Sequence, residues 1–133
     1  MKKAHIKCPY CGSQAYLRPA SVLGKTDECY NGKEFYVCAR YPACDAYVAA
    51  HSTSRLPMGT LADKRLRWLR RDAHVAMERL WNMGIMTKQE TYRWLQTQMG
   101  IPPEDAHIAK FSEFRCEAVI RMCSRLAASQ KAA

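Results

Sequence analysis

The chain has 133 residues, of which 48% are hydrophobic and 25% are charged, so it is long enough for one ordinary domain or two very small ones. It is too short for a multidomain enzyme, and its composition excludes a fibrous repeat and a wholly disordered chain. The net charge of +9, from 21 basic and 12 acidic residues, favours attraction to a polyanion such as nucleic acid.

No segment predicts a membrane span or a secretory signal. The longest purely apolar run, residues 46–50, is far shorter than the roughly 20 residues that cross a bilayer. The opening MKKAHIKCPYCG is basic, but no apolar segment of about 7–15 residues follows it, as a signal peptide requires. We therefore expect a cytoplasmic protein without a membrane partner, in which the seven cysteines stay reduced and serve a metal or the core.

The first third of the chain, residues 1–50, predicts a small antiparallel β unit around the turn dipeptide Asn31-Gly32. Its β-forming residues are Tyr16, Leu17, Val22, Tyr30, Phe35, Tyr36 and Val37. Residues 51–59 are rich in Ser, Thr, Pro and Gly and are predicted to be a linker.

Helical periodicity then predicts a helical domain over residues 60–127, followed by a frayed tail at 128–133. Thr60 and Asp63 resemble a capping box at the start of a long amphipathic helix. The apolar positions of that helix are Leu69, Ala73, Ala76, Leu80 and Met83.

Two further helices have clear end signals. Thr87 and Glu90 form a second capping-box pattern, and Gly100 closes that segment. Ser112 can cap the third helix. The apolar stripe of the third helix is Cys116, Val119, Ile120, Cys123 and Leu126.

The predicted fold class is α+β, with a β hairpin unit packed on a three-helix region. The packing is expected because Leu56, Met58 and Trp68, near the predicted joint, have little else to bury against.

The strongest chemical signal is the pair Cys8 and Cys11, two residues apart and followed by a glycine that relieves the tight turn. Cys38 and Cys44 form a second pair at the other end of the β unit, so four thiolates can converge on one structural Zn²⁺. Cys29 is an alternative to Cys38 or Cys44 as a ligand, although its place near a hairpin tip favours a spectator role. Cys116 and Cys123 are more simply small core residues.

The motif CPYCG, followed by a hairpin and FYVCARYPACDAY, resembles the zinc-ribbon repeats of bacterial type I DNA topoisomerases. This resemblance covers residues 8–48, carries over the four paired cysteines, and implies contact with single-stranded DNA. Over most of its length, with PMGTLADKRLR, AHVAMERLW, YRWLQ and AHIAKF, the chain resembles small zinc-finger-containing proteins of phages and prophages that form a domain family of unknown function.

Lys64, Arg67 and Arg71 share one face of the first helix beside Trp68, an arrangement that can bind phosphates and stack on a base. A solvated basic surface with a packed Trp68 explains the same pattern. In the β unit, Tyr10 and Tyr41 lie beside the metal knuckles and are candidates for base stacking.

No catalytic set is complete in the sequence. His74 and Glu78 are four residues apart on one helix, but a hydrogen-bonded surface pair explains them better than an active site. We therefore expect a non-catalytic accessory protein of phage or prophage origin that binds nucleic acid, preferring single strands. The alternative is a protein-interaction module that modulates a host enzyme or defence complex.

Overall fold

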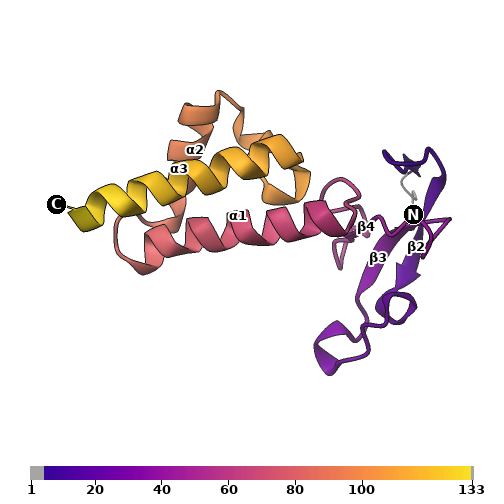
Figure 1. Ribbon diagram of the computed structural model, residues 1–133. Coiled ribbons are helices and arrows are strands. Elements are labelled where there is room, and N and C mark those ends of the chain that lie inside the picture. Colours follow the sequence, from indigo (N-terminus) through magenta and orange to yellow (C-terminus); the bar gives the residue numbers. More distant parts are fainter. Residues whose placement is uncertain (1–4, 133) are drawn as a thin grey trace. The chain divides into compact units, whose positions relative to one another are not determined.

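The computed structural model describes residues 5–132, and these residues form two units. The N-terminal unit ends at Arg65 and holds the strands, and the C-terminal unit begins at Leu66, in the first turn of the first α-helix, and holds the rest of the α-helical part (Figure 1). The predicted α+β class is confirmed. Residues 1–4 of the predicted β unit and residue 133 of the predicted tail lie outside the described residues.

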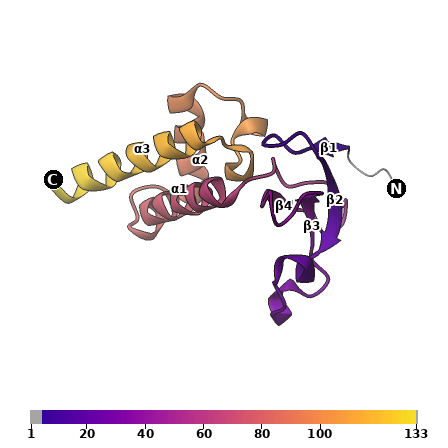
Figure 2. The same ribbon diagram turned by 45° about the vertical axis from the view of Figure 1, so that its right-hand side comes forward.

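The N-terminal unit is a four-stranded antiparallel sheet in the order β1-β2-β3-β4, so that each strand pairs with its neighbours along the chain (Figure 2). The strands are β1 (Ile6–Lys7), β2 (Gln14–Pro19), β3 (Glu34–Cys38) and β4 (Tyr47–Ala49). Strand β3 is buried on both faces, because its Phe-Tyr-Val-Cys run contributes to two apolar clusters. Tyr36 and Cys38 pack in one cluster, and Phe35 and Val37 pack in the other.

The connection between β2 and β3 differs from the predicted hairpin. Val22 and Tyr30 lie in two short 3-10 helices, η1 (Ala20–Leu23) and η2 (Glu28–Tyr30), and not in strands. The predicted turn at Asn31-Gly32 is present, since Gly32 adopts a φ of 76° and the N–H of Lys33 donates to the carbonyl of Tyr30. The loop packs Ala20, Leu23 and Tyr30 against the Phe35 cluster, which gives the sheet a second covered face.

The segment predicted as a linker, residues 51–59, belongs to the folded N-terminal unit. Ala50 forms a β-bridge with Pro57, and Tyr47 of β4 forms another with Ala62. Leu61 and Ala62 are buried, so the chain remains in the unit beyond the predicted boundary at residue 60. The first helix accordingly begins at Lys64, and Thr60 is not its cap.

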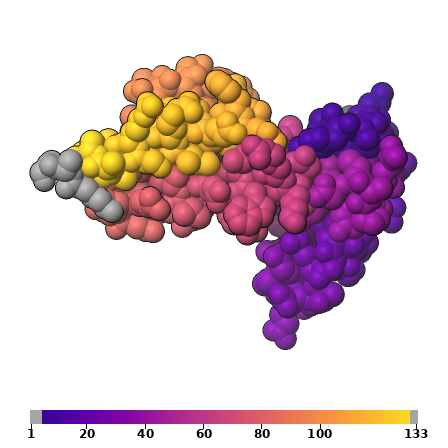
Figure 3. Space-filling model, viewed as in Figure 1, coloured from indigo at the N-terminus to yellow at the C-terminus, as the bar shows by residue number. Residues whose placement is uncertain are grey.

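The helices are α1 (Lys64–Asn82), α2 (Lys88–Met99) and α3 (Glu113–Ala132), and α3 lies alongside α1 (Figures 1 and 3). Two short 3-10 helices, η3 (Pro103–Asp105) and η4 (Ile108–Lys110), connect α2 to α3. None of the described helices is both long and apolar enough to cross a membrane.

The core of the helical unit follows the predicted stripes in part. Ala73 and Leu80 of α1 are buried as predicted, whereas Met83 is exposed, and Leu66 and Met77, which lie outside the predicted stripe, are buried. In α3, Cys116, Val119 and Cys123 are among the most deeply buried residues.

The predicted ends of α2 are confirmed. Thr87 and Glu90 form a reciprocal capping box, and Gly100 adopts the left-handed conformation at the C-cap. The Ser112 hydroxyl accepts a hydrogen bond from the N–H of Arg115, as expected for the cap of α3. Helix α3 then continues to Ala132, so residues 128–132 are helical where a frayed tail was predicted.

Candidate metal centre

Four cysteines converge in the N-terminal unit, and they are the four that form pairs in the sequence. Their sulfur atoms all lie within 4.8 Å of one another, and the group consists of Cys8, Cys11, Cys38 and Cys44. Each of the first two contacts a sulfur of the second pair, with Sγ–Sγ distances of 3.6 Å from Cys8 to Cys44 and 3.4 Å from Cys11 to Cys38. The site therefore joins the turn between β1 and β2 to the turn between β3 and β4, at one end of the sheet.

The spacing of these sulfurs fits a tetrahedral metal. Zn–S bonds of about 2.3 Å in tetrahedral geometry place the sulfurs about 3.8 Å apart, whereas a disulfide would place two of them at about 2.05 Å. The observed separations lie near the first value, and all four cysteines are free. The donor set thus suits one Zn²⁺ ion, whose four-thiolate shell is typical of structural sites.

The first pair sits in a tight turn after β1. Cys8 donates its N–H to the carbonyl of Ser13 at 2.7 Å, and Gly12 donates its N–H to the carbonyl of Cys8 at 2.8 Å. Gly12 adopts a φ of 75°, a conformation that a side chain would strain. This glycine lets the chain turn sharply enough for both sulfurs to face one point.

The second pair is held by the end of β3 and the turn that follows it. The N–H of Tyr41 donates to the carbonyl of Cys38, and the N–H of Cys44 donates to the carbonyl of Arg40, each at 3.0 Å. The N–H of Arg40 also points to the Cys38 sulfur at 3.5 Å. A backbone donor of this kind stabilises a thiolate, as a metal ligand requires.

Burial opposes ionisation of part of the cluster. It raises the pKa of Cys38 to about 12 and also raises the pKa of Cys44. Hydrogen bonding with Ser13 instead lowers the pKa of Cys11 to about 6. Four thiolates this close repel one another, so a divalent cation is the natural source of the compensating charge.

The other three cysteines lie elsewhere. Cys29 lies exposed in η2. Among the described residues, it is not part of the four-cysteine cluster. Cys116 and Cys123 are buried in α3, and their burial raises each pKa to about 11, as expected for unreactive core thiols.

The two tyrosines predicted for base stacking have different surroundings. Tyr10 is 45% exposed, and its hydroxyl accepts a hydrogen bond from the N–H of Asp63, which fixes the ring at the surface. Tyr41 is half-buried and packs against the cluster formed by Ala20, Phe35 and Val37. Tyr10 therefore offers more open ring surface than Tyr41.

The predicted basic residues lie along the first half of α1. Lys64 and Arg71 are exposed, Arg67 is half-buried, and Trp68 is 56% exposed. The guanidinium carbon of Arg71 lies 6.0 Å from the centre of the Trp68 ring, within range of a cation–π contact. Trp68 therefore lies on the surface among cations.

Another arginine of the same stretch has a structural contact. Arg70 donates from Nε to the carbonyl of Phe111 at 3.1 Å, which ties α1 to the segment before α3. Arg70 thus helps to hold the helical unit together.

The pair His74 and Glu78 is formed on α1, with Nδ1 and Oε1 2.6 Å apart. Both side chains are substantially exposed, and the His74 ring also makes an edge contact with Trp81. The pair lies on an open helix surface, as the sequence interpretation favoured.

Besides the cations around Trp68, a second group of basic and aromatic side chains lies in the loop between β2 and β3. The sequence of this loop matches none of the motifs identified above. Lys25 and Lys33 both approach the ring of Tyr30, with Nζ-to-centroid distances of 5.1 and 5.9 Å. The sequence signal that could have indicated it is two lysines on either side of a tyrosine within one loop.

A family model described as a zinc-finger-containing domain matches residues 4–126, nearly the whole chain. Neither the curated proteins nor the solved structures include a match to this sequence.

Proposed function

The chain belongs to this family of zinc-finger-containing domains, and on that premise we propose that it is a non-catalytic zinc-binding module that binds nucleic acid, preferring single strands. As the sequence resemblance implies, we propose a phage or prophage origin. A cytoplasmic location suits the proposal, because reducing conditions keep the four thiols available to zinc.

The observation that carries the proposal is the exposed Trp68 within a run of cations. A solvent-exposed indole is costly unless it has a partner, and its open face can stack on an unpaired base. Lys64, Arg67 and Arg71 lie three and four residues apart along the same helix, so they can contact successive phosphates. Stacking requires bases that are free of a duplex, which is why single strands are favoured.

The N-terminal unit supports the same function through Tyr10. Its ring is exposed next to the Cys8 knuckle, while its hydroxyl is anchored at Asp63. A ring held in this way loses little conformational freedom on stacking. Tyr41 contributes less open surface and is the weaker candidate.

The test is a salt titration of binding to short single- and double-stranded oligonucleotides. A variant carrying Lys64→Ala, Arg67→Ala and Arg71→Ala should bind every sequence more weakly and show a flatter salt slope, by about 0.7 for each single-strand phosphate that the variant no longer binds. The matched control replaces Arg93, Arg121 and Arg125, three exposed arginines of α2 and α3, and should keep the wild-type slope.

Tyr10→Ala should lower the affinity without changing the salt slope, because stacking displaces no counterions. Absence of binding by the wild-type protein at low salt would reject the nucleic-acid function.

We propose no catalytic role for the protein. A tetrahedral zinc bound by four thiolates has no free position for substrate, and the His74–Glu78 pair lies exposed on a helix without a third polar partner in the described contacts.

The protein-interaction alternative is favoured by Phe114, which is 77% exposed in the first turn of α3. Exposed aromatic residues often anchor protein interfaces. Phe114→Ala should leave oligonucleotide binding unchanged. If the wild type binds no oligonucleotide, a protein partner that loses affinity for the Phe114→Ala variant becomes the working hypothesis, with modulation of a host enzyme or defence complex as its role.

A further inference from the structure

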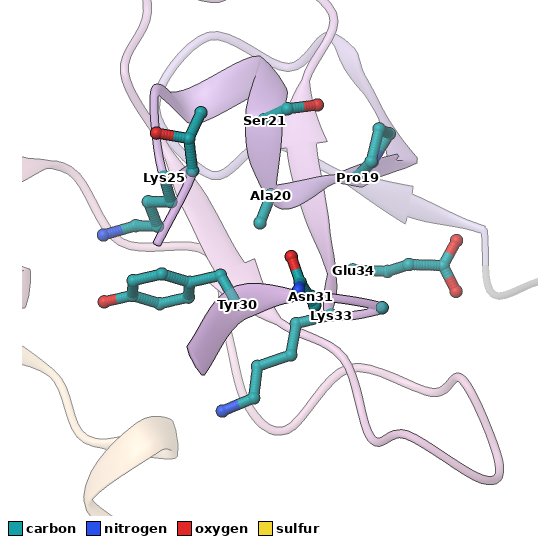
Figure 4. A pocket seen from close by; sticks show the side chains of 10 residues that line it. Pro19, Ala20, Ser21, Lys25, Tyr30, Asn31, Lys33 and Glu34 are labelled. Atoms are coloured by element: carbon teal, nitrogen blue, oxygen red, sulfur yellow. The ribbon is translucent and has the colours of Figure 1, made fainter. Parts of the chain in front are cut away.

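A pocket of about 430 Å³ lies in the N-terminal unit, where the loop of η1 and η2 meets the end of β2 and the start of β3. Ala20, Lys25, Tyr30, Lys33 and Glu34 line it (Figure 4). In Figure 4 the Tyr30 ring lies between the two lysine side chains, and both ammonium groups point to the same side as the Tyr30 hydroxyl.

The two lysines bring uncompensated charge to this pocket. No carboxylate among the described residues forms an ion pair with Lys25 or Lys33. Their close contacts are aromatic instead, since Lys25 also lies 5.9 Å from the centre of the Tyr47 ring. An aromatic ring, unlike a carboxylate, brings no opposite charge, so the ammonium group can still form an ion pair with an anionic ligand.

The one carboxylate that lines the pocket is already neutralised. Arg55 donates from Nε and Nη2 to the two carboxylate oxygens of Glu34, each at 2.9 Å. Asp27 and Glu28 are exposed on the same loop but do not line the pocket. The pocket is therefore positively charged.

Backbone hydrogen bonds hold the pocket open in advance of any ligand. The N–H of Ala20 donates to the carbonyl of Lys33, the N–H of Lys25 donates to the carbonyl of Ala20, and the N–H of Lys33 donates to the carbonyl of Tyr30. These bonds fix both ends of the loop, so binding would order little more than the lysine side chains.

We propose that the rim of this pocket, where the polar ends of Lys25, Tyr30 and Lys33 lie, binds a phosphate group of a nucleic-acid strand, with the two lysines as its cations and the Tyr30 hydroxyl as a neutral donor. The ammonium groups act as point charges suited to phosphate oxygens, and the volume accommodates the attached sugar. The inference rests on the proposed function and adds a second phosphate-binding position, in the zinc-binding unit, to those along α1.

The test compares two variants that each remove two lysine charges, using a fluorescent short oligothymidylate at several salt concentrations. Lys25→Gln with Lys33→Gln should weaken binding by about tenfold or more at low salt, because the charge-assisted hydrogen bonds of both lysines are lost, and should flatten the salt slope by about 0.7 for the one phosphate concerned. The control, Lys7→Gln with Lys88→Gln, removes exposed lysines outside the pocket and should change the affinity less than the pocket variant does. Zinc content verifies that the N-terminal unit is folded in both variants, and tryptophan fluorescence verifies the same for the helical unit.

A second readout is the change in backbone amide shifts when the oligonucleotide is added to the wild type. Shifts in residues 20–34 that are absent from the pocket variant support the proposal. Equal binding by the pocket variant and the control, or no shifts in residues 20–34, overturns it while the α1 surface remains as the binding site. Absence of any wild-type binding instead rejects the proposed function itself, and the pocket proposal with it.

Discussion

Arg55 binds the carboxylate of Glu34 through two hydrogen bonds of 2.9 Å, although the two residues are 21 positions apart. Tyr36, also on β3, donates its hydroxyl to the carbonyl of Arg55. Arg55 adopts a φ of 61°, which is unusual for a residue other than glycine. Together these contacts hold the segment after β4 against β3, so residues 51–59 are part of the fold of the N-terminal unit.

Glu34→Gln should destabilise the N-terminal unit by at most about 1 kcal/mol, because a partly exposed ion pair contributes little even when it is bidentate. The side chains of Arg55 and Glu34 are 38% and 32% exposed. Transfer of zinc to a chelator in increasing urea measures this change. Glu28→Gln, on the exposed loop, is the control and should be as stable as the wild type. If Glu34→Gln instead lowered the free energy of unfolding by more than about 2 kcal/mol, the ion pair would contribute more to the fold than a partly exposed pair should.

The purified protein should contain one equivalent of zinc, and Cys8→Ser should lose it and unfold the N-terminal unit, because structural zinc couples directly to folding. Metal analysis and amide spectra measure the two effects. Cys29→Ser is the matched control, since this thiol is exposed outside the cluster. Zinc loss from the Cys29 variant would mean that the ligand set is wrong.

Thr87→Ala should destabilise the helical unit by about 1 kcal/mol, the usual effect of removing an N-cap side chain. The Thr87 hydroxyl accepts the N–H of Glu90 at 3.1 Å, and the Glu90 carboxylate accepts the N–H of Thr87. Tryptophan fluorescence during urea unfolding measures this unit specifically, because Trp68, Trp81 and Trp94 all belong to it. Thr97→Ala, at an exposed position of the same helix, is the control and should destabilise the helical unit clearly less than Thr87→Ala does.

The helical unit should lose stability as the pH rises from about 9 to about 11. Burial raises the pKa of Cys116 and of Cys123 to about 11, whereas an exposed thiol in the unfolded chain has a pKa of about 8.5. Above that value the unfolded state binds fewer protons than the folded state, so stability falls with pH.

Replacing Cys116 and Cys123 by Ala should flatten this alkaline decline, even if the cavities lower stability at neutral pH. An unchanged pH slope in the double variant would assign the decline to other groups.

The features that the sequence determined are those formed by neighbouring residues. Both ends of α2 depend on residues within one helical turn, namely the capping box of Thr87 and Glu90 and the left-handed Gly100. The local sequence is therefore enough to predict them. The knuckle of Cys8 and Cys11 is equally local, because the turn at Gly12 brings both sulfurs to one side.

Only the tertiary structure decided which distant segments meet. The sequence left Cys29 open as a ligand, and the register of β2 with β3 resolves the choice by bringing Cys38 beside Ala15, next to the first knuckle. The polar composition of residues 51–59 resembles a linker, but the β-bridge of Tyr47 with Ala62 folds the chain back on itself. In the same way Lys25 meets Tyr47 only because the loop packs across the sheet. Such pairings depend on long-range burial and hydrogen bonding, which composition and local spacing do not encode.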